Sequence, residues 1–265
     1  MEEKPKKILY NRQVSAHYYR MGISWDTPSI SPGQFVMVRV TDGLDPLLRR
    51  PFGIYNILGS KGRSRGTGIE LLYKVVGKGT RILSTRKPGD DIDVMGPLGD
   101  GFPYPSGFKK VIMAAGGMGI VPLYLLAKEL HGAAFLFGAR VKEETVFIKD
   151  FRKFMRNVKV ATEDGSYGRK GLVTELLEEE LSPGSVVYAC GPIGMLKQAS
   201  AIARRSGVKC FVSLERSMAC GIGVCLGCAV KSRPHKGEEN KEYKMVCSDG
   251  PVFDSADIDW DSFNL

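Results

Sequence analysis

The segment MAAGGMGIVPLYLL, residues 113–126, places three glycines between an apolar run and a helix-like run. Gly116, Gly117 and Gly119 would let the backbone approach a phosphate, and the N-terminus of the following helix would supply N–H donors and a favourable dipole. Pro122 stands where the third glycine of the common G-x-G-x-x-G pattern would be, so a plain tight turn is the alternative. The segment predicts a strand, a turn and a helix, with a nucleotide site at the turn.

Around this segment, short apolar runs alternate with helix-like runs. We expect strands at KVIMAAG (110–116), AAFLFGAR (133–140), VKVATED (158–164), SVVYACGP (185–192) and VKCFVSLE (208–215). Helices are expected at VPLYLLAKEL (121–130), at GLVTELLEEEL (171–181) and from Met195 to a stop at Gly207. Strand and helix in alternation predict a parallel sheet with helices on its faces. This α/β domain is expected to span residues 105–214.

Two further strand ends in this domain carry candidate binding residues. Cys190, Gly191 and Pro192 follow a later strand, at the carboxyl edge where such sheets bind ligands. Glu163 and Asp164 end the third strand, where they would disfavour a 2′-phosphate and accept hydrogen bonds from a ribose. The sequence therefore predicts NAD rather than NADP, with two exposed loop acids as the alternative.

The first hundred residues have a different pattern, with strand-like runs separated by turn residues. The runs are GQFVMVRV (33–40), RPFGIYNIL (50–58), GIELLYKVV (68–76) and DDIDVMGPL (90–98). Several short strands at such spacing predict a small antiparallel β-barrel. We place this domain at residues 1–104.

The last segment, residues 215–265, is too short to bury its own core without help. Its cysteines follow the spacing Cys220-x4-Cys225-x2-Cys228-x18-Cys247, and the first three match plant-type [2Fe-2S] centres. A structural zinc site also takes four thiolates, but it favours paired C-x2-C knuckles, of which only one is present. We therefore expect a small [2Fe-2S] module here, and we expect the separate Cys210 in the core.

Composition narrows the class of protein. Of 265 residues, 43% are hydrophobic and 25% charged, as in an ordinary globular protein, and no run of about 18 apolar residues or signal peptide is evident. We expect a cytoplasmic protein without membrane contact, where clustered cysteines favour metal or redox chemistry over disulfides. The net charge is +9, but the basic residues are scattered, so nucleic acid is not expected; a basic face that docks an acidic protein is the alternative.

The chain has a predicted barrel followed by the segments GGMGIVP and then ACGP. This order resembles that of the ferredoxin-NADP reductase superfamily. With LERSMACGIGVCLGCAV (214–230) and VCSDGPVFD (246–254), the chain resembles the electron-transfer subunits of type B dihydroorotate dehydrogenases over essentially its whole length. The cysteine segment is the most specific part of this resemblance.

The resemblance implies FAD in the barrel. The family binds it through an Arg-Pro-x-Ser/Thr segment, and a glycine takes the place of the hydroxyl residue here, which removes one side-chain donor near the flavin. Arginine suits the diphosphate because its hydrogen bonds are charge-assisted. Ordinary strand residues and a plain turn are the alternative for these positions. The implied residues are Arg50, Pro51, Phe52, Gly53, Leu72, Tyr73, Lys74, Gly79 and Thr80.

The resemblance also implies a function and a partner. Electrons would run from dihydroorotate to the FMN of a catalytic subunit, then through the cluster and FAD of this chain to NAD+, within a heterotetramer that serves pyrimidine biosynthesis. No catalytic acid or base is expected, because hydride transfer needs positioning above all.

The near alternative is the small subunit of another NADH-linked oxidoreductase, of ferredoxin:NADP or hydrogenase type. In the former an Asp commonly replaces the first cluster cysteine, which here is Cys220. A non-catalytic zinc-binding module is the alternative from another class.

Overall fold

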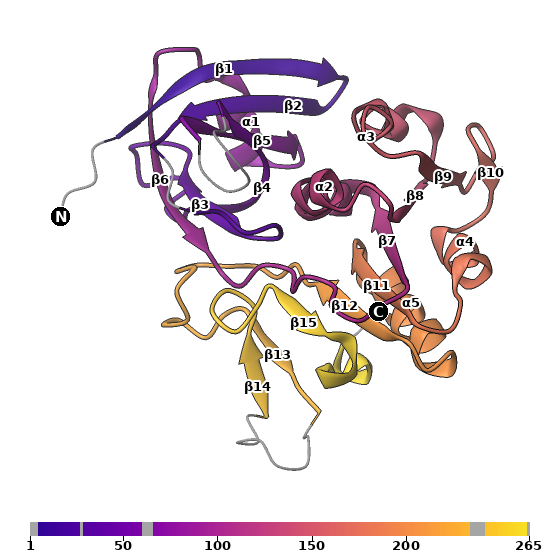
Figure 1. The fold of residues 1–265 in the computed structure, drawn as a ribbon. Helices are drawn as coiled ribbons and strands as arrows, with labels where there is room; N and C mark the ends of the chain where they lie inside the picture. Colours follow the sequence, from indigo (N-terminus) through magenta and orange to yellow (C-terminus); the bar gives the residue numbers. More distant parts are fainter. Residues whose placement is uncertain (1–4, 27–28, 60–65, 234–241, 264–265) are drawn as a thin grey trace.

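A computed structural model describes residues 5–26, 29–59, 66–233 and 242–263. Figure 1 shows a barrel at the upper left, a sheet with helices at the right, and the C-terminal segment in orange and yellow beneath both. This arrangement confirms the predicted fold class of a β-barrel, a parallel-sheet domain and a C-terminal segment. None of the helices in the described residues is long and apolar enough to cross a membrane.

The barrel is closed by six strands in the order β1-β2-β5-β4-β3-β6. The sequence analysis named four of them and missed the first two, of which β1 carries three charged residues and only one buried residue, Ile8. One helix, α1, follows β5 where only a turn was expected. The elements are β1 (Lys6–Ser15), β2 (Tyr18–Ser24), β3 (Phe35–Arg39), β4 (Arg50–Leu58), β5 (Gly68–Lys74), α1 (Lys78–Thr85) and β6 (Asp91–Leu98).

The second domain is a seven-stranded sheet of order β10-β9-β8-β7-β11-β12-β15. The five predicted strands are present and parallel, and the three predicted helices α2, α4 and α5 are confirmed. The elements are β7 (Lys110–Gly116), α2 (Ile120–Glu129), β8 (Ala134–Ala139), α3 (Ile148–Phe151), β9 (Asn157–Thr162), β10 (Arg169–Lys170), α4 (Val173–Glu180), β11 (Ser185–Cys190), α5 (Ile193–Arg205) and β12 (Lys209–Ser213).

The C-terminal segment is tied to both domains. Its strands β13 (Ala229–Lys231) and β14 (Tyr243–Met245) pair with each other, whereas β15 (Val252–Asp254) joins the large sheet antiparallel to β12. The backbone N–H of Asp100, just after the barrel, donates to the Gly250 carbonyl at 2.6 Å. The proposed boundary at 214/215 therefore divides segments that share one sheet, and all three domain ranges stay predictions.

Three hydrophobic cores account for the packing. One fills the barrel, and one joins helix α2 and its face of the sheet to the barrel residues Tyr18, Tyr55 and Leu72. The third combines the opposite face of the sheet, the C-terminal segment and two barrel residues, Phe35 and Met37. This shared core buries the apolar side chains of the C-terminal segment, which is too short to form a core of its own.

Candidate functional site

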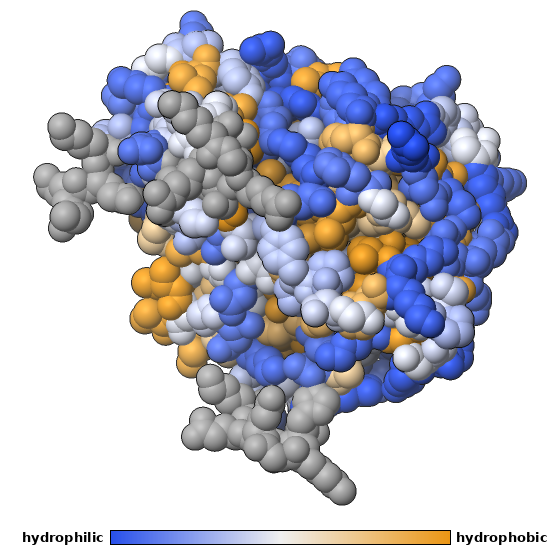
Figure 2. Space-filling view, viewed as in Figure 1, coloured by the Kyte–Doolittle hydropathy of each residue, from blue (hydrophilic) through white to orange (hydrophobic). Residues whose placement is uncertain are grey.

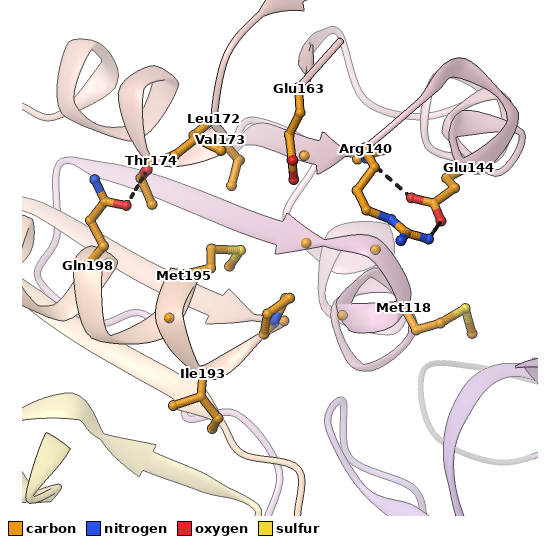
Figure 3. Close-up of a pocket in the computed structure, with 18 of the residues that line it drawn as sticks. Met118, Arg140, Glu144, Glu163, Leu172, Val173, Thr174, Ile193, Met195 and Gln198 are labelled. Carbon is orange, nitrogen blue, oxygen red and sulfur yellow. Dashed lines mark hydrogen bonds and ion pairs between the residues drawn. The ribbon is translucent and has the colours of Figure 1, made fainter. Parts of the chain in front are cut away.

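A cavity of about 660 Å³ opens at the carboxyl ends of the parallel strands. The glycine turn after β7 and the turn after β11 form one side of it, so Gly116, Gly117, Gly119, Gly191 and Pro192 all line the same space. Figure 3 shows side chains from the other side of the cavity facing this space. Two motifs that lie more than seventy residues apart in the sequence thus meet at one site.

The glycine turn is shaped by close backbone packing. A Cβ atom on Gly119 would lie 2.0 Å from the carbonyl oxygen of Cys190, a distance that no side chain tolerates. Gly117 has φ of +52°, and a Cβ there would meet nothing within 4 Å, so its backbone borders open space. Gly119 therefore allows the two turns to pack closely, and the backbone at Gly117 stays open to a phosphate group in the cavity.

Cys190 does not line the cavity. Its side chain is fully buried, and it pairs in register with Ser213 on β12, whose hydroxyl hydrogen-bonds to the thiol. Burial raises the pKa of the Cys190 thiol, so the thiol stays protonated. What Cys190 presents to the glycine turn is its backbone carbonyl.

The two acids at the end of β9 take different positions. The Glu163 side chain points into the cavity (Figure 3). Asp164 instead accepts hydrogen bonds from the backbone N–H and the hydroxyl of Ser166, at 2.9 and 2.6 Å, and it does not line the cavity. Hydrogen bonds from Ser166 lower the pKa of Asp164. Only one of the two predicted ribose partners therefore faces the space.

An ion-pair chain that sequence reasoning missed borders the same cavity. Glu144 accepts hydrogen bonds from the Arg140 guanidinium at 2.8 Å and from the Lys74 ammonium at 3.2 Å. These contacts, with that from Arg140 foremost, lower the pKa of Glu144 to about 2. Lys74 belongs to β5 of the barrel, so the chain joins the two domains at the cavity. Arg140 directly follows β8, and Glu215 stands two residues after the end of β12. The rule that ligands bind at the carboxyl ends of strands could have indicated both cavity residues.

The predicted diphosphate residues of the barrel meet at the start of α1. The Arg50 side chain lies against Gly79, where a Cβ would be 3.1 Å from the guanidinium Nε. The Thr80 hydroxyl accepts hydrogen bonds from the backbone N–H groups of Val76 and Gly77, at 2.9 and 3.1 Å. The expected turn is thus the N-terminus of a helix, with Gly77 as its N-cap, the Thr80 side chain bonded back to the Gly77 N–H, and Arg50 beside it.

The other predicted flavin residues are packed more tightly than expected. Leu72 and Tyr73 are each 2% exposed, and the Tyr73 hydroxyl donates to Asn11 at 3.0 Å. Phe52 meets the Tyr73 ring edge to face. A Cβ on Gly53 would lie 3.0 Å from Val121 of α2, so a Ser or Thr at this position would crowd the neighbouring domain. This contact explains why a glycine fits here.

The four C-terminal cysteines form two pairs. The Cys228 thiol donates to Cys247 at 3.3 Å, and both residues are buried. Cys220 and Cys225 form the outer pair, in which the Cys225 thiol hydrogen-bonds to the Cys220 sulfur. Within the described ranges, no group of three or more His, Cys, Asp or Glu side chains is arranged to hold a metal ion. Two thiol pairs suit a centre of two irons, with two thiolates on each.

Backbone N–H groups surround these sulfurs. The Cys220 sulfur accepts from Ile222 and Cys225 at 3.4 and 3.5 Å, and the Cys247 sulfur accepts from Gly223 at 3.1 Å. The backbone donors lower the pKa of Cys220 to about 6, whereas burial raises that of Cys247 to about 12. Donors of this kind favour thiolate ligands and stabilise negative sulfur in a cluster.

Comparison with known proteins agrees with this geometry. Residues 215–259 match the family model of the iron-sulfur cluster binding domain of dihydroorotate dehydrogenase B. The matched range contains all four paired cysteines.

Curated relatives extend the similarity to the whole chain. The electron transfer subunit of dihydroorotate dehydrogenase B (NAD(+)) from Caldanaerobacter subterraneus subsp. tengcongensis is 40% identical over 252 residues, covering 95% of this chain and 96% of the relative. The subunit of the same name from Desulforamulus reducens is 41% identical over 265 residues, covering 96% and 97%.

Solved structures share the fold. A structure reported for the NADH-dependent reduced ferredoxin-NADP oxidoreductase matches with a TM-score of 0.80 at 30% identity, covering 98% of this chain and 92% of that one. Phthalate dioxygenase reductase matches with a TM-score of 0.64 at 18% identity, covering 91% and 93%, which shows likeness of fold alone.

Proposed function

Because the chain belongs to the family of electron transfer subunits of dihydroorotate dehydrogenase B (NAD(+)), we propose that it carries electrons from a separate FMN-containing catalytic subunit to NAD+. The observation that supports this most directly is the presence of three sites in one chain. The barrel that carries the Arg50 segment shares a core with Cys228 and Cys247 through Phe35 and Met37, and the Lys74–Glu144 ion pair joins it to the glycine-lined cavity.

Each site fits one redox group by its donor chemistry. The four cysteines would hold a [2Fe-2S] cluster, and Arg50 with the N-terminus of α1 would hold the diphosphate of FAD. The turns at Gly117 and Gly191 would hold the diphosphate of NAD, with Glu163 toward its ribose. When bound, FAD exchanges electron pairs with a nicotinamide and single electrons with a cluster. The chain's own residues bind and orient these groups and require no acid or base.

The catalytic partner would dock over the cysteine loop. Ile222, Val224 and Leu226 lie between the cluster cysteines and are 54, 75 and 64% exposed. Figure 2 shows a hydrophobic patch on the left of the molecule, where the orange loop after β12 lies in Figure 1. Large apolar side chains rarely stand exposed in such a group without a binding partner. We further propose that the partner carries FMN and that the complex is a heterotetramer with two chains of each kind. The proposed location of this complex is the cytoplasm.

The test is to purify the chain with its native catalytic subunit and follow NAD+ reduction by dihydroorotate. We expect one orotate and one NADH per turnover, with flavin and cluster absorbance in this chain. A colourless chain, or activity with another electron donor but none with dihydroorotate, would contradict the proposal. As a matched pair, Val224→Asp should weaken capture of the catalytic subunit about tenfold or more, and Leu9→Asp, on exposed β1, should not.

Replacing Glu163 with glutamine should raise kcat/KM for NADPH relative to NADH about tenfold. The carboxylate faces the cavity and repels a 2′-phosphate, and losing a like charge of this kind is worth on the order of 1 kcal/mol. Steady-state rates with both nucleotides and ferricyanide as acceptor measure the ratio. Asp164→Asn is the matched control, because Asp164 faces Ser166 instead. An equal shift in both variants would refute the role given to Glu163.

A further inference from the structure

Strand β3 has two buried faces that serve different parts of the protein. Val36 and Val38 point into the barrel core, whereas Phe35 and Met37 belong to the core that contains Cys228 and Cys247. The alternation follows from the two-residue period of a strand. One strand therefore fills the barrel with one face and supports the cysteine segment with the other.

The outer face of β3 continues into the proposed flavin segment. Met37 pairs in register with Pro51 of β4, and Phe35 pairs with Gly53. Directly opposite residues of an antiparallel pair share a face, with Cβ atoms about 5 Å apart. Met37 thus shares its face of the barrel with Pro51 and Gly53 of the Arg50–Gly53 segment, whereas Arg50 and Phe52 pair with Val38 and Val36 on the other face.

The cysteine loop rests on the same side chain. A Cβ on Gly221 would lie 2.5 Å from Met37 Cγ and 3.2 Å from its sulfur, and Gly221 has φ of +77°. Gly221 directly follows Cys220, and in Figure 1 the orange loop runs beneath the barrel at β3 and β6. Met37 is itself 0% exposed, so it has no room to turn away from this contact.

We propose that Met37 is a positioning residue that joins the flavin segment to the cluster loop, so that electrons cross between the two sites through its packed side chain. This inference rests on the proposed function. With both groups bound, each transfer would move one electron from the cluster to FAD during dihydroorotate oxidation, and no bond of Met37 would form or break. Close-packed atoms give such a transfer a continuous medium, whereas a void interrupts it.

The test compares Met37→Ala with Met21→Ala in the full chain that carries FAD and cluster. Met21 is also 0% exposed but lies in the barrel core, so both variants lose one buried methionine. After mixing with NADH, we expect Met37→Ala to slow cluster bleaching about tenfold or more, while flavin reduction stays within about twofold. Met21→Ala should leave both rates near those of the unchanged chain. Met37→Leu, which nearly conserves volume, should restore cluster bleaching to within about threefold.

A second readout needs no electron transfer. Amide hydrogen exchange at residues 219–223 should rise about tenfold in Met37→Ala and stay unchanged in Met21→Ala, because only the former loses the support beneath Gly221. Equal cluster bleaching in Met37→Ala and the unchanged chain would overturn the proposal, as would equal slowing in both alanine variants. If the unchanged chain holds no flavin or cluster, the proposed function fails first, and this inference fails with it.

Discussion

Replacing Cys225 with serine should abolish the visible absorbance and the electron paramagnetic resonance signal of the cluster, while FAD stays bound. Cys225 is the exposed member of the outer cysteine pair, so its loss leaves one iron of a two-iron centre with a single thiolate. FAD should remain because the contacts of Arg50 with Gly79 and with the Leu48 carbonyl lie within the barrel and do not depend on Cys225. The ratio of flavin released by denaturation to protein measures whether FAD stays bound.

Cys210→Ser is the matched control for this prediction. It makes the same chemical change at a buried cysteine of β12 that lies outside the two pairs, next to Ser255. Cluster signals should survive in this variant. Loss of both cluster and FAD in Cys225→Ser would contradict separate anchoring of the two groups. A cluster retained at full intensity in Cys225→Ser would show that Cys225 is not a ligand.

Much of the fold could be predicted because apolar periodicity reports burial. The five parallel strands and three helices of the sheet domain are strongly patterned, and all are present. Strand β1 was missed because three of its residues are charged and only one is buried, and β2 was missed because its buried residues do not alternate regularly along the strand. Strand β15 has three residues and lies beside β12 only through tertiary packing, which no local pattern records.

The candidate site could be predicted where the residues of a motif lie close together in the sequence. The glycine turn, the ACGP turn and the cysteine spacing each stand within a few residues, and the structure brings the two turns into one cavity. The Arg140–Glu144–Lys74 chain was not predictable in this way, since its members come from two domains. Asp164 and Cys190 show the converse: a suggestive position in sequence says nothing about which way a side chain points.

Replacing Gly119 with alanine should disrupt the nucleotide cavity more than replacing either of the other two glycines of the turn with alanine. Its Cβ would lie 2.0 Å from the Cys190 carbonyl oxygen and 2.3 Å from the carbonyl carbon, so backbone must move. Overpacking of this kind costs about 3 kcal/mol, and a shift of about 1 Å in bound NADH lowers the hydride transfer rate about a hundredfold. Thermal unfolding and the rate of flavin reduction by NADH measure the two effects.

Gly132→Ala separates this steric effect from a general cost of losing glycine. Gly132 precedes β8, has no positive φ, and a Cβ there would meet nothing within 4 Å. It should change neither melting temperature nor flavin reduction appreciably. Cluster absorbance should stay intact in Gly119→Ala, because the cysteine loop rests on β3 and not on the glycine turn. Normal flavin reduction in Gly119→Ala would mean that the turn after β7 can part from Cys190 without harm, and the cavity formed by these two turns would then not be where NADH binds.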